Sequence, residues 1–144
     1  MKIYTIGFTK KSAEEFFDIL ERNKVKTVID VRLNNSSQLA GFSKGRDLSY
    51  FLKKLVGINY VHRSDLAPTK EILDAYKSKL ITWEQYETKF LNLLKDRKPI
   101  VDTSLFDQAC LLCSEEVADH CHRRLVANYI LDLITTDTPK IIHL

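Results

Sequence analysis

Residues 27–32, Thr27-Val28-Ile29-Asp30-Val31-Arg32, decide the fold, because their apolar side chains do not alternate cleanly with polar ones. A strand with one solvated face alternates, whereas a strand buried on both faces is a nearly continuous apolar run, as in parallel sheets. We therefore expect a parallel strand whose end carries Asp30 and Arg32 on one face. The two side chains either pair with each other or take part in a site, where they orient a partner or clamp an anion.

Strand and helix signals alternate on both sides of this segment. Short apolar runs predict further strands at 3–7, 58–62, 109–113 and 141–144. Capping residues predict helices between them: Ser12 with Glu15, Thr69 after Pro68, and Thr82 with Gln85. The alternation predicts one α/β domain over residues 1–144, with a mostly parallel sheet of about five strands and helices on both faces. Two of the helices form a helical insertion at about 69–96.

Helical spacing also predicts which side chains face the core. We expect inner faces made by Ala13, Phe16, Phe17 and Leu20; by Leu48, Phe51, Leu52 and Leu55 with Gly57 as C-terminal cap; by Ile72, Leu73, Tyr76 and Leu80; by Trp83, Tyr86, Phe90 and Leu93; and by Leu125, Tyr129 and Leu133, with Asp119 capping this last helix. Residues 33–45 form a long polar loop, a kind that is often functional, with disorder as the competing explanation. Ile100-Val101 is either a short strand or part of a connector.

Composition narrows the class of protein. The 144 residues are 44% hydrophobic with a net charge of +3, which allows an anionic partner but falls short of a typical nucleic-acid footprint. All three cysteines lie within twelve residues, which favours free thiols in a reducing compartment over a disulfide framework. No run is long enough to span a membrane, and the N-terminus does not resemble a signal peptide. We expect a cytoplasmic protein without a membrane partner, and the sequence leaves its oligomeric state open.

Candidate functional residues follow the ends of four predicted strands, where open α/β sheets bind ligands. These places are Gly7-Phe8, 30–32, 62–65 and 113–124, and the last reads C-S-E-E-V-A-D-H-C-H-R-R. Arg123 and Arg124 in the first turn of a helix oppose its dipole, at a cost of roughly 0.3–1 kcal/mol each. Either a bound anion compensates for them, or Glu115, Glu116 and Asp119 pair with them locally.

The same segment offers thiols. Cys113 and Cys121 each lie close to a helix N-terminus and to His or Arg, so each is either an activated nucleophile or a buried structural cysteine. Cys110 should point to the opposite side of its strand and act as a buried apolar side chain. Cys113, Cys121 and His122, joined by His62 or His143, could bind zinc, but their spacing fits no standard zinc pattern. We therefore expect no metal and no cofactor, and no nucleotide-binding or hydrolase motif is present.

Several segments together resemble the family known as domain of unknown function 488. They are I-Y-T-I-G at 3–7, V-I-D-V-R at 28–32, L-L-C-S-E at 111–115, C-H-R-R at 121–124 and I-I-H-L at 141–144, and D-L-A-P-T at 65–69 resembles one branch. The resemblance implies that the residues that matter are Gly7, Asp30, Arg32, Cys113, Glu115, Cys121, His122, Arg123 and His143. Phe8 replaces a histidine of many members, and Leu33-Asn34-Asn35-Ser36-Ser37 lacks their proline. The family supplies no settled activity.

Two functional hypotheses follow. The first is an enzyme with thiol-dependent chemistry on a small anionic or nucleotide substrate, by analogy with the strand, Cys loop, Arg and helix layout of sulfurtransferases and phosphatases. Its residues would be catalytic Cys113, Cys121, His122 and Glu115, anion-binding Arg32, Arg123 and Arg124, and orienting Asp30, Gly7 and His143. The second is a nucleic-acid-binding or accessory module without catalysis, whose phosphate contacts would come from Lys10, Lys11, Lys44, Arg46, Arg63, Arg123 and Arg124. A purely structural role is the third alternative.

Overall fold

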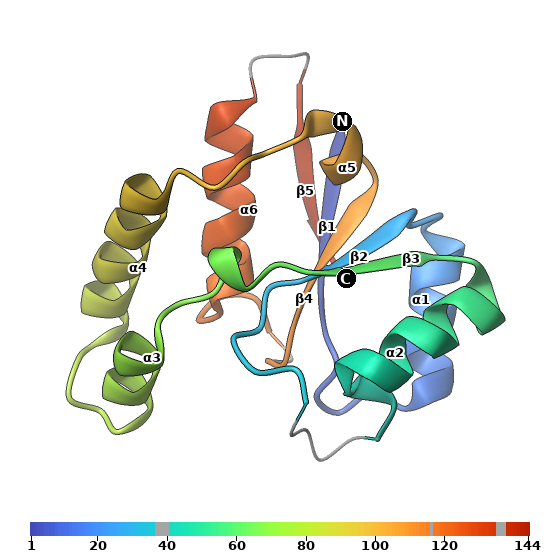
Figure 1. Cartoon of the computed structure of the whole chain (residues 1–144), viewed down its shortest axis with the longest axis horizontal. Helices are drawn as coiled ribbons and strands as arrows, with labels where there is room; N and C mark the ends of the chain where they lie inside the picture. Colours follow the sequence, from blue (N-terminus) through green and yellow to red (C-terminus); the bar gives the residue numbers. More distant parts are fainter. Residues whose placement is uncertain (37–40, 116, 135–137) are drawn as a thin grey trace.

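A parallel sheet forms the centre of the computed structural model, which describes residues 1–36, 41–115, 117–134 and 138–144 (Figure 1). Its five strands are β1 (Lys2–Gly7), β2 (Thr27–Asp30), β3 (Asn59–His62), β4 (Ala109–Cys113) and β5 (Lys140–His143), in the order β3-β2-β4-β1-β5. Every neighbouring pair is parallel. The predicted α/β fold with a parallel sheet is confirmed.

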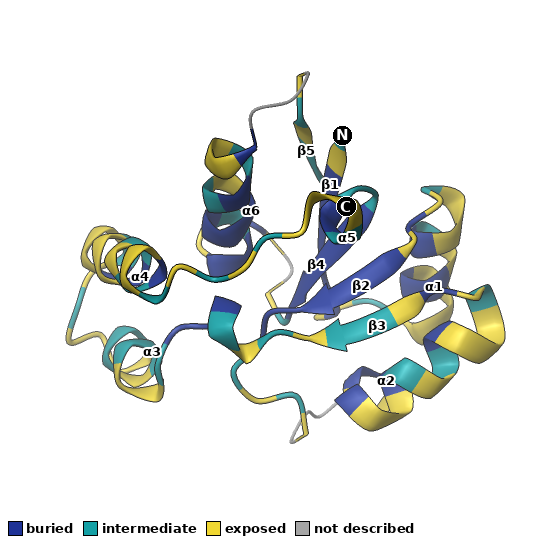
Figure 2. Ribbon diagram, turned by 45° about the horizontal axis from the view of Figure 1, so that its top comes forward, coloured by how far each residue is buried: buried dark blue, intermediate teal, exposed yellow. Residues whose placement is uncertain are grey.

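Strand β4 lies in the middle and pairs with both β1 and β2. Gly7 of β1 pairs with Cys113, and Asp30 of β2 pairs with Leu112. The carboxyl ends of the three central strands therefore meet at one edge of the sheet. These strands are buried on both faces, whereas β3 and β5 are only partly covered (Figure 2). The apolar run at 27–32 has the burial that its composition predicted.

Helices cover the two faces of the sheet as separate layers. One face packs against α1 (Ala13–Arg22) and against α2 (Gly45–Phe51), which continues as a π-helical segment, Leu52–Val56, to the left-handed Gly57. The other packs against α4 (Trp83–Arg97), α5 (Thr103–Phe106) and α6 (His122–Leu133). Because side chains alternate along β4, Cys110 faces the first layer and Cys113 faces the second. This confirms the prediction that the two thiols point apart.

The helical insertion is also confirmed. It consists of α3 (Lys70–Lys77) and α4, which lie at the side of the molecule beyond α6 (Figure 1). The Thr69 side chain accepts a hydrogen bond from the Ile72 amide, and Thr82 with Gln85 forms both bonds of a capping box. These caps satisfy amides that the first turn of a helix leaves unpaired, so both helices begin where the sequence predicted.

Some details differ from the predictions. Helix α6 begins at His122 with Cys121 as the N-cap residue, so Asp119 does not cap it. Ala13, Leu55 and Leu80 are exposed, and Leu133 is half exposed, so none of them belongs to an inner face. Leu80 lies outside any helix because α3 ends at Lys77, and Lys79 then takes a left-handed conformation (φ 62°). Ile100-Val101 lies in a connector, after which Asp102 caps α5. Of the predicted loop at 33–45, residues 37–40 lie outside the described residues.

Candidate functional site

The candidate site lies where β2 and β4 end side by side. The segment after β2 leads to α2 on one face of the sheet, and the segment after β4 leads to α6 on the other, so the two diverge and leave a crevice. A cavity of about 790 Å³ occupies this place. Its walls come from the segment after β2, the insertion and the start of α6, and they include Arg32, Asn34, Trp83, Cys113, Cys121 and His122.

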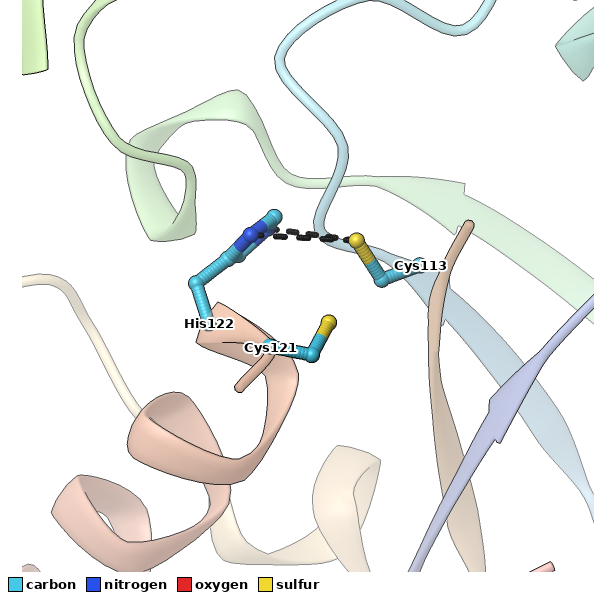
Figure 3. Close-up of side chains that lie close together, drawn as sticks. All are labelled: Cys113, Cys121 and His122. Carbon is cyan, nitrogen blue, oxygen red and sulfur yellow. Dashed lines mark hydrogen bonds between the residues drawn. The ribbon is translucent and has the colours of Figure 1, made fainter. Parts of the chain in front are cut away.

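Two thiols and an imidazole converge at this cavity. Cys113 ends β4, and Cys121 and His122 begin α6; their sulfur and nitrogen atoms all lie within 4.8 Å of one another (Figure 3). His122 Nε2 donates a 2.7 Å hydrogen bond to the Val31 carbonyl, which leaves Nδ1 with its lone pair. The Cys113 Sγ atom lies 3.7 Å from both ring nitrogens, so it faces the ring instead of aligning with one of them. The structure thus brings together three of the residues that the sequence singled out.

The three thiols have different acidities because their surroundings differ. A hydrogen bond from Cys121 lowers the pKa of Cys113 against the opposing effect of burial, and Arg123 adds to the lowering. The proton that Cys121 donates, together with burial, raises the pKa of Cys121. Burial raises the pKa of Cys110 on the other side of the strand. Of the three, Cys113 is the thiol whose surroundings favour a thiolate.

Asp30 and Arg32 form a buried ion pair next to the cluster. Arg32 donates from Nε and Nη2 to the Asp30 carboxylate at 2.8 and 2.7 Å, and Tyr60 donates its hydroxyl to the same carboxylate at 2.6 Å. The Asn35 amide donates to the Tyr60 oxygen at 3.0 Å. Burial, and then the hydrogen bond to Asp30, raise the pKa of Tyr60 to about 12. The sequence left this pair as one of two alternatives, and it offered no signal for Tyr60 or Asn35, which come from β3 and the 33–36 segment.

One guanidinium nitrogen of this pair has no partner. Among the described residues, Arg32 Nη1 is the buried side-chain polar atom that lacks a hydrogen bond, and only 4% of the Arg32 side chain is exposed. Leaving a buried donor unsatisfied costs about 1–3 kcal/mol. The Phe8 ring, whose centroid lies 5.3 Å from the guanidinium carbon, offers a π face but no acceptor atom. The described part of the protein therefore supplies no hydrogen-bond acceptor for this donor.

Arg123 is held by protein groups instead of facing the cavity. It is 1% exposed; Nη1 donates to the Glu115 carbonyl, and Nε lies 3.4 Å from the Thr5 hydroxyl. The Thr5 hydroxyl in turn lies 2.6 Å from His143 Nδ1 on β5. A Cβ atom on Gly7 would lie 1.6 Å from the Glu115 oxygen, so the close approach of this loop requires glycine. These contacts fix the segment between Cys113 and Cys121 on the sheet.

Arg124 is held on the side of the insertion. Its Nε donates to the Asp119 carbonyl at 3.1 Å, its Nη2 lies 3.8 Å from a Glu87 carboxylate oxygen, and its guanidinium carbon lies 5.9 Å from the Trp83 ring centroid. The described carboxylate that compensates for Arg124 thus comes from α4, instead of from the acidic residues at 115–119. Glu116 lies outside the described residues. Glu115 is exposed on the cavity wall, and its contacts with the described residues indicate no particular role for its carboxylate.

The remaining candidate residues are dispersed. His62 donates from Nε2 to the Arg32 carbonyl at 2.8 Å, and Arg63 pairs bidentately with Asp65. Neither His62 nor His143 belongs to the described cluster of metal-binding atoms. Arg63, Arg123 and Arg124 have protein partners, and the nucleic-acid hypothesis stays a prediction.

The fold and the site define an α/β protein with a cysteine and histidine cluster at the strand ends. Over residues 12–130 the chain matches the family described as Domain of unknown function DUF488, and it belongs to that family. The resemblance inferred from the sequence motifs is thereby confirmed. No curated protein and no solved structure matches the chain. In the described part of the chain, no helix has the length and apolar character needed to cross a membrane.

Proposed function

We propose that this protein is a thiol-dependent enzyme that acts on a small anionic substrate, with Cys113 as the nucleophile. The observation that carries the proposal is the unpartnered Nη1 atom of Arg32, a residue that lines the same cavity as Cys113. A phosphate or sulfur oxyanion, free or on a nucleotide, would supply the acceptor that this donor lacks. The three free thiols suit the reducing cytoplasm.

The charges at the cavity wall balance one another, so the directed donor of Arg32, and not the net charge, favours an anion. Asp30 neutralises the charge of Arg32, so Arg32 contributes a directed N–H donor more than a free positive charge. Lys70 and Lys77 stand on the wall beside it, against the carboxylates of Asp74 and Glu115. Arg32 is thus paired with Asp30 and Lys70 with Asp74, which leaves Lys77 and Glu115 as one cationic and one anionic side chain.

The cluster supplies the other parts of a group transfer. Cys113 Sγ attacks the sulfur or phosphorus atom of the substrate, and a bond to Sγ forms as the bond to the leaving group breaks. Cys121 is hydrogen-bonded to Cys113 and stabilises its sulfur anion. His122 faces the reacting sulfur, so its Nδ1 lone pair can take the proton of the Cys113 thiol and then pass it to the leaving group. Water or an acceptor thiol then takes the group from Cys113, which regenerates the free thiol.

Alkylation by a charged and a neutral reagent tests this proposal. We expect iodoacetate to modify Cys113 before Cys110 and Cys121, and faster than iodoacetamide does, because the carboxylate is drawn to Arg32. Sulfate or phosphate should slow the reaction. Arg32→Lys keeps a cation beside Asp30 but removes the planar guanidinium group with its several N–H donors. The variant should therefore react no faster with iodoacetate than with iodoacetamide.

Cys110→Ser is the matched control, because Cys110 lies on the same strand but faces the opposite layer. It should leave the modification of Cys113 unchanged. Modification of Cys113 no faster than that of Cys110 in the wild-type chain, or equal rates for the two reagents without protection by anions, would refute the proposal.

A further inference from the structure

The cluster of Cys113, Cys121 and His122 has the dimensions of a metal site. In a tetrahedral zinc site, bonds of about 2.3 Å to sulfur and about 2.1 Å to nitrogen place sulfur and nitrogen about 3.6 Å apart and two sulfurs about 3.8 Å apart. Cys113 Sγ lies 3.7 Å from His122 Nδ1, and all three donor atoms lie within 4.8 Å of one another. An ion between them therefore needs changes of about 1 Å or less in these distances, together with a reorientation of the His122 ring.

The hydrogen bond of His122 to the backbone also suits a ligand. Imidazoles that bind metals usually donate their second N–H to a carbonyl or a carboxylate, which fixes the ring and directs the free nitrogen to the ion. His122 donates from Nε2 to the Val31 carbonyl, and Nδ1 is left for the metal. Because the Cys113 sulfur now faces the ring, binding requires the imidazole to rotate about χ2 and aim Nδ1 at the ion.

Charge and burial select the kind of ion. Cys113, Cys121 and His122 are 5%, 3% and 6% exposed, so a charged complex at this place would be costly. Two thiolates and one neutral imidazole exactly balance a divalent cation, and thiolates prefer zinc over magnesium or calcium. Arg123 Nη1 lies 3.7 Å from the Cys121 sulfur and can donate to it, which stabilises a thiolate ligand.

The fourth coordination position faces the cavity. All three ligand residues belong to its wall, as do Glu115 and Arg32. Zinc sites with three protein ligands and one open position bind water or another small ligand there. We propose that Cys113, Cys121 and His122 bind one zinc-like thiophilic divalent cation, with the fourth position open to the cavity, and that the bound ion withdraws Cys113 from thiol chemistry. The second half of this inference rests on the proposed function, whereas the metal site does not.

Cobalt titration of the reduced, metal-free chain tests the site directly. We expect one Co²⁺ per chain, with the visible bands of tetrahedral cobalt and the near-ultraviolet band of thiolate ligation, and displacement of cobalt by zinc. Cys121→Ser should lose the thiolate band, whereas the matched control Cys110→Ser should keep it. No stoichiometric binding, or a thiolate band that persists unchanged in Cys121→Ser, would overturn the metal site.

A second measurement needs no variant and covers the case in which Cys121→Ser does not fold. Zinc should protect Cys113 and Cys121 of the wild-type chain from iodoacetamide at least tenfold, as mapped by mass spectrometry, while Cys110 keeps its own rate. Equal rates with and without zinc would reject the site. Zinc binding to a chain whose metal-free Cys113 reacts no faster than Cys110 would refute the proposed enzyme alone. A fast Cys113 without zinc binding would refute the metal site alone.

Discussion

Replacement of Asp30 by asparagine should be among the most damaging single changes in this chain. The Asp30 side chain is fully buried and accepts from the amide, Nε and Nη2 of Arg32 and from the Tyr60 hydroxyl. Asparagine keeps the shape but removes the negative charge, and its NH₂ group meets donors where a carboxylate oxygen had accepted them. Arg32 would then be a buried cation without its counter-ion.

The expected cost follows from burial. Breaking a buried ion pair by removing one partner costs about 3–5 kcal/mol. For a chain of this size each kcal/mol lowers the melting temperature by about 2–4 °C, so Asp30→Asn should melt on the order of 10 °C below the wild type. Urea unfolding at constant salt, followed by far-ultraviolet circular dichroism, would measure the change in the free energy of unfolding.

The chain contains a matched control at the end of the neighbouring strand. Arg63 and Asp65 form a bidentate pair with the same spacing of two residues and the same distances of 2.8 and 2.7 Å, but the Asp65 side chain is 44% exposed. Asp65→Asn should therefore cost at most about 1 kcal/mol. Asp30→Asn combined with Arg32→Met should recover most of the loss, because no buried charge remains. Equal costs for Asp30→Asn and Asp65→Asn would refute the reasoning.

Three further predictions concern glycine, pH and helix capping. Gly7→Ala should lower the free energy of unfolding, measured in urea, by about 1–3 kcal/mol, because the added Cβ atom meets the Glu115 carbonyl. Gly41→Ala is the control and should be neutral, because nothing lies within 4 Å of its Cβ position. Equal effects of the two substitutions would contradict the packing argument. Burial, and then Arg123, lower the pKa of His143 below 6.5 in the folded chain. The contribution of the neutral His143 side chain to stability is therefore present above pH 6.5 and is lost as the pH falls through the lower folded pKa. His143→Gln should make the free energy of unfolding depend less on pH in that range, and an unchanged slope would contradict this. Thr82→Ala removes the capping box of α4 and should cost about 1 kcal/mol in urea unfolding, and no loss would show that the cap does not stabilise the helix.

Local signals in the sequence were sufficient for the five strands and for the helices other than α5. The apolar run at 27–32 and the caps at Thr69 and Thr82 depend on neighbours within a few residues, so they could be read directly. The last helix shows the limit of such signals. Asp119 has a good capping side chain, but Cys121 takes the N-cap position because contacts of Arg123 with Glu115 and Thr5 hold the preceding segment on the sheet.

The candidate site was likewise predicted in part, where its residues lie close together in the sequence. The motif residues Cys113, Cys121 and His122 were predicted together because they lie close in the chain. The residues that complete the site lie far away in the sequence. Tyr60 donates to Asp30, Glu87 and Trp83 lie against Arg124, and the helical insertion forms a wall of the cavity. One sequence contains no signal for such pairings, because they depend on the order of strands in the sheet and on how the insertion packs.

The central position of β4 also affects how the chain assembles. β1 and β2 are never neighbours, since each pairs with β4, which begins only at Ala109. A growing chain shorter than this has two strands with an unfilled place between them, and their exposed edges are prone to pair with other chains. The place between β1 and β2 can be filled only after residue 113 has been synthesised, so Cys113 reaches its surroundings after both of these strands have been made. Assembly of the cysteine and histidine cluster therefore waits until Cys121 and His122 have also been synthesised.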